Sequence, residues 1–166
     1  MVDLLERSNI DIVGGLVGAS LGFEGIFRVT DRCVADKCNP NLFIYAKAFY
    51  EQVPLFDHCF VADRVKNFFL ADRHAVLAAG SWDTSRPFFE HEDFFIQMRR
   101  SGVRVAVCTD MNIRHKPINR HLAALRVPYM GAMERHLLLK WGVTAKHNCK
   151  PHMYSLQSCC ETCKQV

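Results

Sequence analysis

The sequence predicts an α/β fold, because strand-like and helix-like segments alternate through the middle of the chain. Asn67–Ala71 is an apolar run of strand length, and Asp72–Ala79 consists largely of helix formers. Glu92–Ser101 has a second helical pattern, and the β-branched run Val103–Cys108 follows it. Strand, helix, loop, helix and strand in this order are typical of an open α/β sheet, which places its functional side chains at the strand ends.

The composition is that of one folded globular domain. The chain has 166 residues, 49% of them hydrophobic, and its twelve Phe can supply a sizeable core. Its net charge is +4, and Lys and Arg are scattered along the sequence without a dense run or stripe. We therefore expect no nucleic-acid partner.

The sequence predicts no targeting signal and no membrane-spanning segment in this chain. The longest apolar stretch, Ile12–Leu21, contains three glycines and is far shorter than the ~20 residues of a transmembrane helix. The residues after Met1 lack the basic and apolar regions of a secretory signal. We expect membrane attachment only through a segment outside this chain.

The chain is expected to start with a helix and a strand. Val2–Ser8 carries apolar residues on one side and charged residues on the other, which predicts a short helix. Ile10–Val13 alternates and is rich in β-branched residues, which predicts a strand. Gly14–Gly15 is expected to close that strand, at a point of positive φ or of close approach to a ligand.

A pair of extended segments is predicted next. Ile26–Thr30 and Leu42–Tyr50 are apolar and are expected to pair across the polar loop Asp31–Asn41. Cys33 and Cys38 lie in this loop and could cross-link it.

The middle of the chain predicts a buried strand and a capped helix. Asn67–Ala71 is expected to be central in its sheet because it is apolar throughout most of its length. Asp72 is placed as the N-cap of the following helix and Gly80 as its C′ residue. Ser81–Pro87 is expected to be a loop.

The densest group of reactive side chains is Glu90–Phe95, which combines acids with large apolar residues at a helix start. Carboxylates in a first turn and basic residues in a last turn complement the helix dipole, and Arg99 and Arg100 stand before the stop at Gly102. The residues expected to face the core are Phe94, Phe95 and Met98.

The C-terminal part predicts further strand and helix. Val103–Cys108 is a strand, Thr109–Asp110 a turn, and Ile113–His115 an extended continuation. Met130–Trp141 is predicted to be a helix.

Eight cysteines indicate disulfides or a metal site, and four of them lie in the last 18 residues. Disulfides in an oxidising compartment, zinc and free thiols are all open at this stage. A zinc site would use the pair Cys160 and Cys163, completed from His147, Cys149 or His152.

Five segments resemble, in the same order, the C-terminal half of the β-1,4-N-acetylgalactosaminyltransferases that make ganglioside-type glycans. The resemblance covers about residues 1–140 and is carried by Val2–Arg7, Asp11–Gly15, Asn67–Ala71, His91–Phe95, and Cys108–Asp110 with His115.

The resemblance implies the C-terminal half of a GT-A fold, with a mixed sheet flanked by helices. It implies a Golgi enzyme that transfers a sugar, GalNAc, from a UDP-sugar donor to a hydroxyl of a glycan or glycolipid acceptor with inversion. A divalent metal, Mn²⁺ or Mg²⁺, would bind the diphosphate.

The resemblance also assigns roles to single residues. Asp93 matches the general base, which single displacement requires, and the helix start would favour its ionised form. Glu92 is expected to orient the acceptor, and His115 matches a metal ligand at a strand end. The other substrate-binding candidates are His91, which could equally be a local cap, Trp82, which stacks on a sugar or packs in the core, Asn67 and Asp63.

One feature departs from the resemblance, because the chain contains no Asp-x-Asp motif to hold metal and UDP. We expect a fragment, with a glycosyltransferase-like domain at 1–145, a Cys-rich tail at 146–166 and exposed apolar surface where the missing half would dock. The alternatives are a non-catalytic, degenerate binding module and a small zinc module built around the tail.

Overall fold

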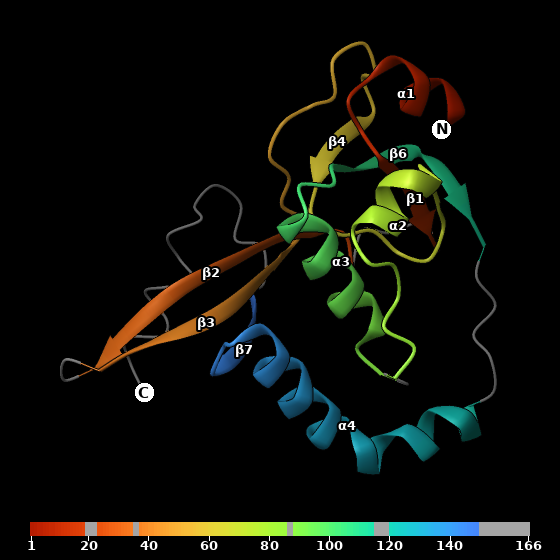
Figure 1. The fold of residues 1–166 in the computed structure, drawn as a ribbon. Coiled ribbons are helices and arrows are strands. Elements are labelled where there is room, and N and C mark those ends of the chain that lie inside the picture. The colour runs from red at the N-terminus through yellow and green to blue at the C-terminus, as the bar shows by residue number, and fades with distance from the viewer. Residues whose placement is uncertain (19–22, 35–36, 86–87, 115–119, 150–166) are drawn as a thin grey trace.

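A computed structural model describes residues 1–18, 23–34, 37–85, 88–114 and 120–149 of the chain. Within these residues, helices and strands form two mixed sheets with helices around them (Figure 1). The elements are α1 (Val2–Arg7), β1 (Ile12–Val17), β2 (Gly25–Val34), β3 (Lys37–Ala46), β4 (Cys59–Ala62), β5 (Phe69–Ala71), α2 (Arg73–Ala78), α3 (Glu90–Arg100), β6 (Val105–Ile113), α4 (Arg120–Trp141) and β7 (Ala145–Cys149). This mixed α/β arrangement confirms the predicted fold class at that level.

The larger sheet has the strand order β4-β6-β1-β5, so β1 and β6 are central. These two strands are parallel, and β4 and β5 pair with them in the antiparallel direction. Ile12, Val105 and Val107 of the central strands are fully or almost fully buried, as strands covered on both faces require.

β5 lies at the edge of this sheet, so the prediction of a central strand at Asn67–Ala71 is wrong. The strand itself is only Phe69–Ala71, and the Leu70 side chain is exposed. Apolar composition alone does not distinguish an edge from a centre, because the number of neighbouring strands depends on the whole topology.

Gly14 and Gly15 lie inside β1, so the prediction that they close the strand is also wrong. A Cβ on Gly14 would lie 2.6 Å from the Cβ of Val65, and one on Gly15 would lie 2.7 Å from Phe68 Cε1. The expected close approach therefore exists, but protein side chains make it. Both positions need glycine because there is no room for a side chain.

The smaller sheet has the order β2-β3-β7 and contains a long antiparallel hairpin. Its ribbon projects from the rest of the molecule in Figure 1. The predicted loop Asp31–Asn41 is mostly strand, because pairing continues from Asp31 opposite Pro40 to Val34 opposite Lys37. β7 pairs with β3 in the parallel direction. This strand spans residue 146, where the Cys-rich tail was expected to begin.

β6 runs unbroken from Val105 to Ile113, so no turn interrupts it at Thr109–Asp110. An irregularity in its pairing with β1 lies between Gly15 and Leu16, where the register shifts from Cys108 to Asn112. This irregularity leaves the residues between Cys108 and Asn112 of β6 without partners in β1. The predicted turn at Thr109–Asp110 falls within this unpaired part of the strand.

The helices follow the predicted capping and amphipathic patterns. Asp72 caps α2, since its Oδ1 accepts from Ala75 N at 2.8 Å, and Gly80 has the expected positive φ of 98°. The first two helices are short, whereas α4 is 22 residues long and begins ten residues before the predicted helix at Met130. None of the described helices is both long and apolar enough to span a bilayer.

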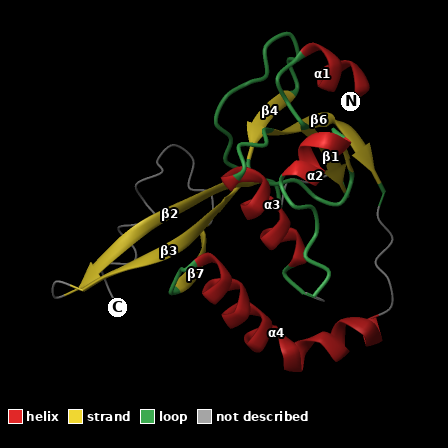
Figure 2. Cartoon of the chain, viewed as in Figure 1, coloured by secondary structure: helices red, strands yellow, loops and turns green. Residues whose placement is uncertain are grey.

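The main core lies between the larger sheet and α3. Phe94, Phe95 and Met98 of α3 are buried against Val105 and Val107 of β6, which confirms the predicted inward face. Figure 2 shows α3 between the strands of this sheet and the long helix α4. α3 is thus held on its sheet by aromatic burial, worth roughly 1.5–3 kcal/mol for each large side chain.

A disulfide joins β4 to β6, between Cys59 and Cys108, which lie directly opposite each other. Cys38 and Cys149 are likewise disulfide-bonded. The prediction of disulfides is therefore confirmed for these residues, and Cys149 is not a free zinc ligand. Cys159, Cys160, Cys163 and His152 lie outside the described residues.

Candidate active site

The first turn of α3 carries three carboxylates, Glu90, Glu92 and Asp93. Phe89 precedes the helix with φ of 58°, and no side chain caps this end. The alternative of His91 as a local cap is therefore not observed. Unbonded N–H groups and the helix dipole at such a start stabilise negative charge.

Asp93 is almost completely buried, at 1% exposure, and the end of α4 binds it. Its Oδ2 accepts from Lys140 Nζ at 2.7 Å, and its Oδ1 accepts from Trp141 Nε1 at 2.8 Å. Lys140 Nζ also donates to Asp83 Oδ2 at 2.9 Å. Lys140 therefore bridges a buried and a partly exposed carboxylate, and Trp141 holds the buried one in a single orientation.

Glu92 points to a different partner, the buried guanidinium of Arg64. The two groups are 3.9 Å apart, and their side chains are 17% and 6% exposed. Burial lowers the pKa of Arg64 to about 10, while the nearby carboxylates of Glu92 and Glu24 act in the opposite direction. Arg64 therefore remains a cation at neutral pH, and its guanidinium carbon lies 4.2 Å from the centre of the Phe23 ring.

A second ion pair lies beside this one. Glu24 is fully buried, and its Oε1 is 3.9 Å from Lys66 Nζ. Lys66 also donates to the carbonyl of Val17, the last residue of β1, at 2.8 Å. The cluster thus reaches the carboxyl end of a central strand, which is where open α/β sheets place their ligands.

His91 and Trp82 add aromatic rings to the same region. His91 meets Phe23 and Trp82 edge to face, with centroid distances of 6.0 and 5.6 Å. Trp82 stacks on the buried Phe94 at 4.2 Å, so core packing accounts for one face of its ring. His91 Nδ1 and Arg64 Nε are buried and hydrogen-bond to no described residue.

Two of the predicted substrate-binding residues lie apart from this turn. Asp63 binds Arg99 in the last turn of α3, at the other end of the helix from Glu92. Asn67 is exposed before β5 and takes no part in the hydrogen bonds described above. The predicted metal ligand His115 lies outside the described residues.

A divalent metal requires several hard oxygen ligands that converge on one point. In the described part of the chain, the single group of three possible ligands is Cys59, Cys108 and Asp110. The two sulfurs of this group form the disulfide and cannot bind metal as thiolates. The described residues therefore contain no set of three converging carboxylate or histidine ligands.

The sequence did not reveal the cations that bind Asp93, Glu92 and Glu24, or the other partners of these carboxylates. The sequence does show Lys140 and Trp141 side by side at the end of a predicted helix. A charge pattern does not reveal which side chains are buried, so this pair could not be recognised as the partner of a buried carboxylate. The residues concerned are Glu24, Arg64, Lys66, Lys140 and Trp141.

Three curated relatives are similar to this chain over 118 residues, which is 69% of it. They are β-1,4 N-acetylgalactosaminyltransferase 1 from Homo sapiens, Rattus norvegicus and Mus musculus, at 32%, 31% and 30% identity. No family model matches the chain, and no solved structure matches it. The match spans 21% of each relative. The chain is therefore a distant homologue of β-1,4 N-acetylgalactosaminyltransferase 1 that spans about a fifth of the length of these relatives.

Proposed function

We propose that this chain carries the acceptor side of a glycosyltransferase, with Asp93 as the general base. The reaction transfers a sugar, GalNAc by the name of the relatives, from a UDP-sugar to a glycan or glycolipid hydroxyl. The observation that carries this proposal is the oriented Asp93 carboxylate at the start of α3, beside Glu92, in a homologue of such an enzyme.

The proposed chemistry is a single displacement. The acceptor oxygen attacks the anomeric carbon, Asp93 takes the hydroxyl proton, and the bond from that carbon to UDP breaks with its electron pair on UDP. The attack comes from the face opposite UDP, so the configuration inverts. Lys140 and Trp141 fix the orientation of the Asp93 carboxylate by their hydrogen bonds to its two oxygens.

Acceptor entry requires a local movement, since the Asp93 carboxylate is only 1% exposed. Lys140 has a side chain that is 27% exposed and lies at the C-terminal end of α4, so it is the group that moves aside. Glu92 and His91 then bind neighbouring acceptor hydroxyls, with Arg64 holding Glu92 in place.

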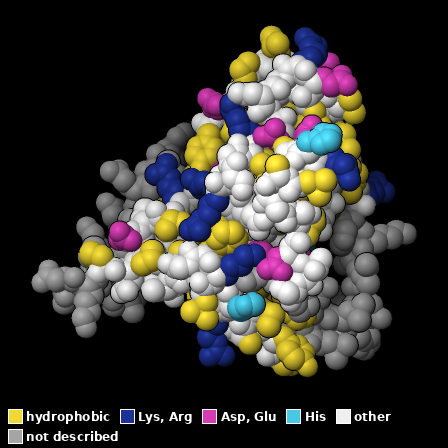
Figure 3. All heavy atoms as spheres, in the orientation of Figure 1, with side chains coloured by type: hydrophobic (Ala, Val, Ile, Leu, Met, Phe, Trp, Pro, Cys, Tyr) yellow, Lys and Arg dark blue, Asp and Glu magenta, His cyan; other side chains and the backbone are white. Residues whose placement is uncertain are grey.

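The proposed compartment is the Golgi lumen, by resemblance to these transferases. The disulfide between Cys59 and Cys108 supports an oxidising compartment, since such bonds are rare in the cytosol. We assign no step to a metal ion, because the described residues contain no set of three converging carboxylate or histidine ligands. On the face drawn in Figure 3, Lys and Arg are interspersed with acidic and apolar side chains.

A non-catalytic glycan-binding module is the second candidate. The observation that favours it is the same Asp93, whose two oxygens already accept hydrogen bonds inside the fold. In that case the cluster would stabilise the junction of α3 and α4 and would take part in no reaction.

The test measures transfer from UDP-GalNAc to a panel of glycans and glycolipids by the full chain and by Asp93→Asn. We expect the substitution to lower kcat by about 10²–10⁴ with little change in donor KM, because general-base catalysis contributes that much. The matched control is Asp72→Asn, because Asp72 is exposed and Asn also caps helices well.

Equal turnover by the wild type and Asp93→Asn would show that Asp93 is not the base. If the wild type binds glycans without transferring sugar, and Asp93→Asn only lowers the thermal midpoint, the binding module is the correct function.

A further inference from the structure

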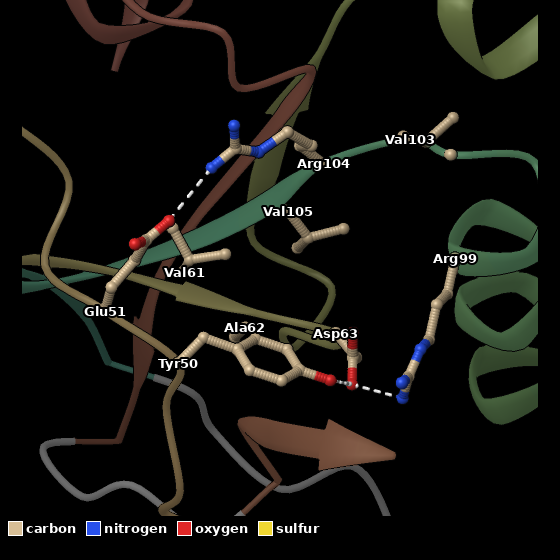
Figure 4. Close-up of a pocket in the computed structure, with 10 residues that line it drawn as sticks. Tyr50, Glu51, Val61, Ala62, Asp63, Arg99, Val103, Arg104 and Val105 are labelled. Atoms are coloured by element: carbon tan, nitrogen blue, oxygen red, sulfur yellow. Dashed lines mark hydrogen bonds and ion pairs between the residues drawn. The ribbon is translucent and has the colours of Figure 1, made fainter. Parts of the chain in front are cut away.

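A cavity of about 430 Å³ lies at the opposite end of α3 from Asp93 (Figure 4). It is bounded by the end of β4, the start of β6 and the last turn of α3. Because β1 and β6 are parallel, this is the amino end of the central strands, whereas the cluster around Glu92 reaches the carboxyl end of β1. The cavity is thus a separate place from the candidate active site. Its volume lies within the range of about 300–1,000 Å³ seen for ligand pockets.

One wall of the cavity contains a buried carboxylate that binds three donors through one of its oxygens. The Asp63 side chain is 8% exposed, and its Oδ2 accepts from Phe27 N at 2.6 Å, Tyr50 Oη at 2.8 Å and Arg99 Nη1 at 2.7 Å. None of the described residues donates to Oδ1. Among the described residues, Oδ1 therefore keeps its capacity to accept a hydrogen bond.

Arg99 supplies hydrogen-bond donors next to the Asp63 carboxylate. Arg99 uses Nη1 for Asp63 and for the carbonyl of Phe27, and its side chain is 40% exposed. A guanidinium has five N–H groups, so the rest of Arg99 can still donate. Tyr50 contributes an aromatic ring to the same wall.

A second ion pair closes the other end of the cavity. Arg104 Nη2 lies 3.2 Å from Glu51 Oε1, and Figure 4 shows Val61 and Val105 between this pair and Asp63. The cavity therefore has an apolar floor, with one acid and one base at each end. Each end of the cavity pairs one acid with one base, so an anion or a cation would meet a like charge beside an opposite one, and the two pairs give no net attraction for either ion.

We propose that this cavity is a saccharide-binding site, separate from the place of sugar transfer. A pyranose is neutral, carries hydroxyls that both donate and accept, and has an apolar C–H face that can pack on the valine floor or on Tyr50. The carboxylate, the guanidinium groups and the apolar floor complement these features together. The inference stands on the cavity itself and does not require that the chain transfer sugar.

The test uses the full chain and three sugars that share one ring but differ in charge: N-acetylglucosamine, glucosamine and glucuronic acid. Binding is measured by saturation-transfer NMR and by titration. We expect neutral N-acetylglucosamine to bind best. Val103→Phe fills the cavity and should weaken binding by about tenfold or more.

Val103 is half-buried, so Val103→Phe could disturb the fold. A second variant at the exposed rim of the cavity tests the same site without that risk. Glu51→Ala changes an exposed side chain of the cavity and should also weaken binding, whereas Asp57→Ala changes an exposed acid of the same segment outside it. Asp57→Ala should bind as the wild type does. Asp93→Asn should retain binding, which separates this site from the transfer site.

Stronger binding of glucosamine or glucuronic acid would overturn the neutral-ligand inference. Unchanged affinity in both Val103→Phe and Glu51→Ala, or loss of binding in Asp93→Asn alone, would place the sugar elsewhere.

Discussion

Asp63 shows how a single buried residue joins distant segments of this chain. Its carboxylate binds the start of β2 through Phe27, the segment after β3 through Tyr50, and α3 through Arg99. Burial raises the pKa of Asp63 above its usual value, and the three donors oppose that rise. The folded state thus binds the Asp63 proton more tightly than the unfolded chain does, so this group's contribution to stability is present in acid and is lost as pH rises through the raised pKa.

The hydrogen bond from Tyr50 to Asp63 has a measurable effect on the pKa of Tyr50. Burial, followed by the hydrogen bond to Asp63, raises the pKa of Tyr50 from 10.0 to about 12. Since the folded pKa is the higher one, the stabilising contribution of neutral Tyr50 is present below pH 10.0 and is lost as pH rises to about 12. An ultraviolet titration of the native protein should show a late phenolate transition near pH 12.

Tyr50→Phe should remove this late transition, and Tyr129→Phe should leave it in place, because Tyr129 is exposed on α4. Identical titration curves for Tyr50→Phe and the wild type near pH 12 would show that Tyr50 does not titrate late.

At the scale of elements, substitution of two glycines, one after α2 and one within α4, is expected to change the stability of the protein in opposite directions. Gly80 ends α2 with φ of 98°, and an added Cβ would lie 2.2 Å from Gln97 Nε2 of α3. Gly131 lies within α4, and a Cβ added there would meet none of the described neighbours within 4 Å. Position 80 therefore needs glycine for its backbone conformation, and a Cβ there would also displace the end of the Gln97 side chain, whereas position 131 has neither constraint.

Gly80→Ala should lower the free energy of unfolding by about 1–2 kcal/mol, and Gly131→Ala should raise it by about 0.5–1 kcal/mol. Urea denaturation of the two variants beside the wild type measures both effects. The same sign of change in both variants would contradict the structural difference between these positions.

At the scale of the whole molecule, the disulfide between Cys59 and Cys108 closes a loop of 49 residues. It attaches β4, an edge strand of four residues, to the central strand β6. The double variant C59A/C108A should lose about 2–4 kcal/mol of unfolding free energy, because the unfolded chain gains the freedom of an open loop.

Urea unfolding without reductant tests this prediction, since reductant would also open the bonds of Cys38 and Cys149. Hydrogen exchange gives a second readout, in which the amides of β4 should exchange faster in C59A/C108A. An unchanged midpoint and unchanged exchange would show that the bond does not stabilise β4.

Much of the local structure could be predicted from neighbouring residues. The Asp72 cap, the Gly80 stop and the inward face of α3 depend on residues within a few positions of one another, and all three are confirmed. The prediction that Asn67–Ala71 is a central strand depended on distant neighbours, and it was wrong.

The sequence by itself determined the helices α1, α2 and α3, most of the strand positions and the acid-rich start of α3, because hydrophobic period and capping chemistry act over one or two turns. The tertiary structure alone decided what Asp93 binds, since Lys140 lies 47 residues further along the chain. It likewise decided that Asp63 lies at a cavity away from the first turn of α3, through its bond to Arg99, 36 residues away. Contacts over such separations depend on how strands order within the sheet, and that order is a property of the whole fold.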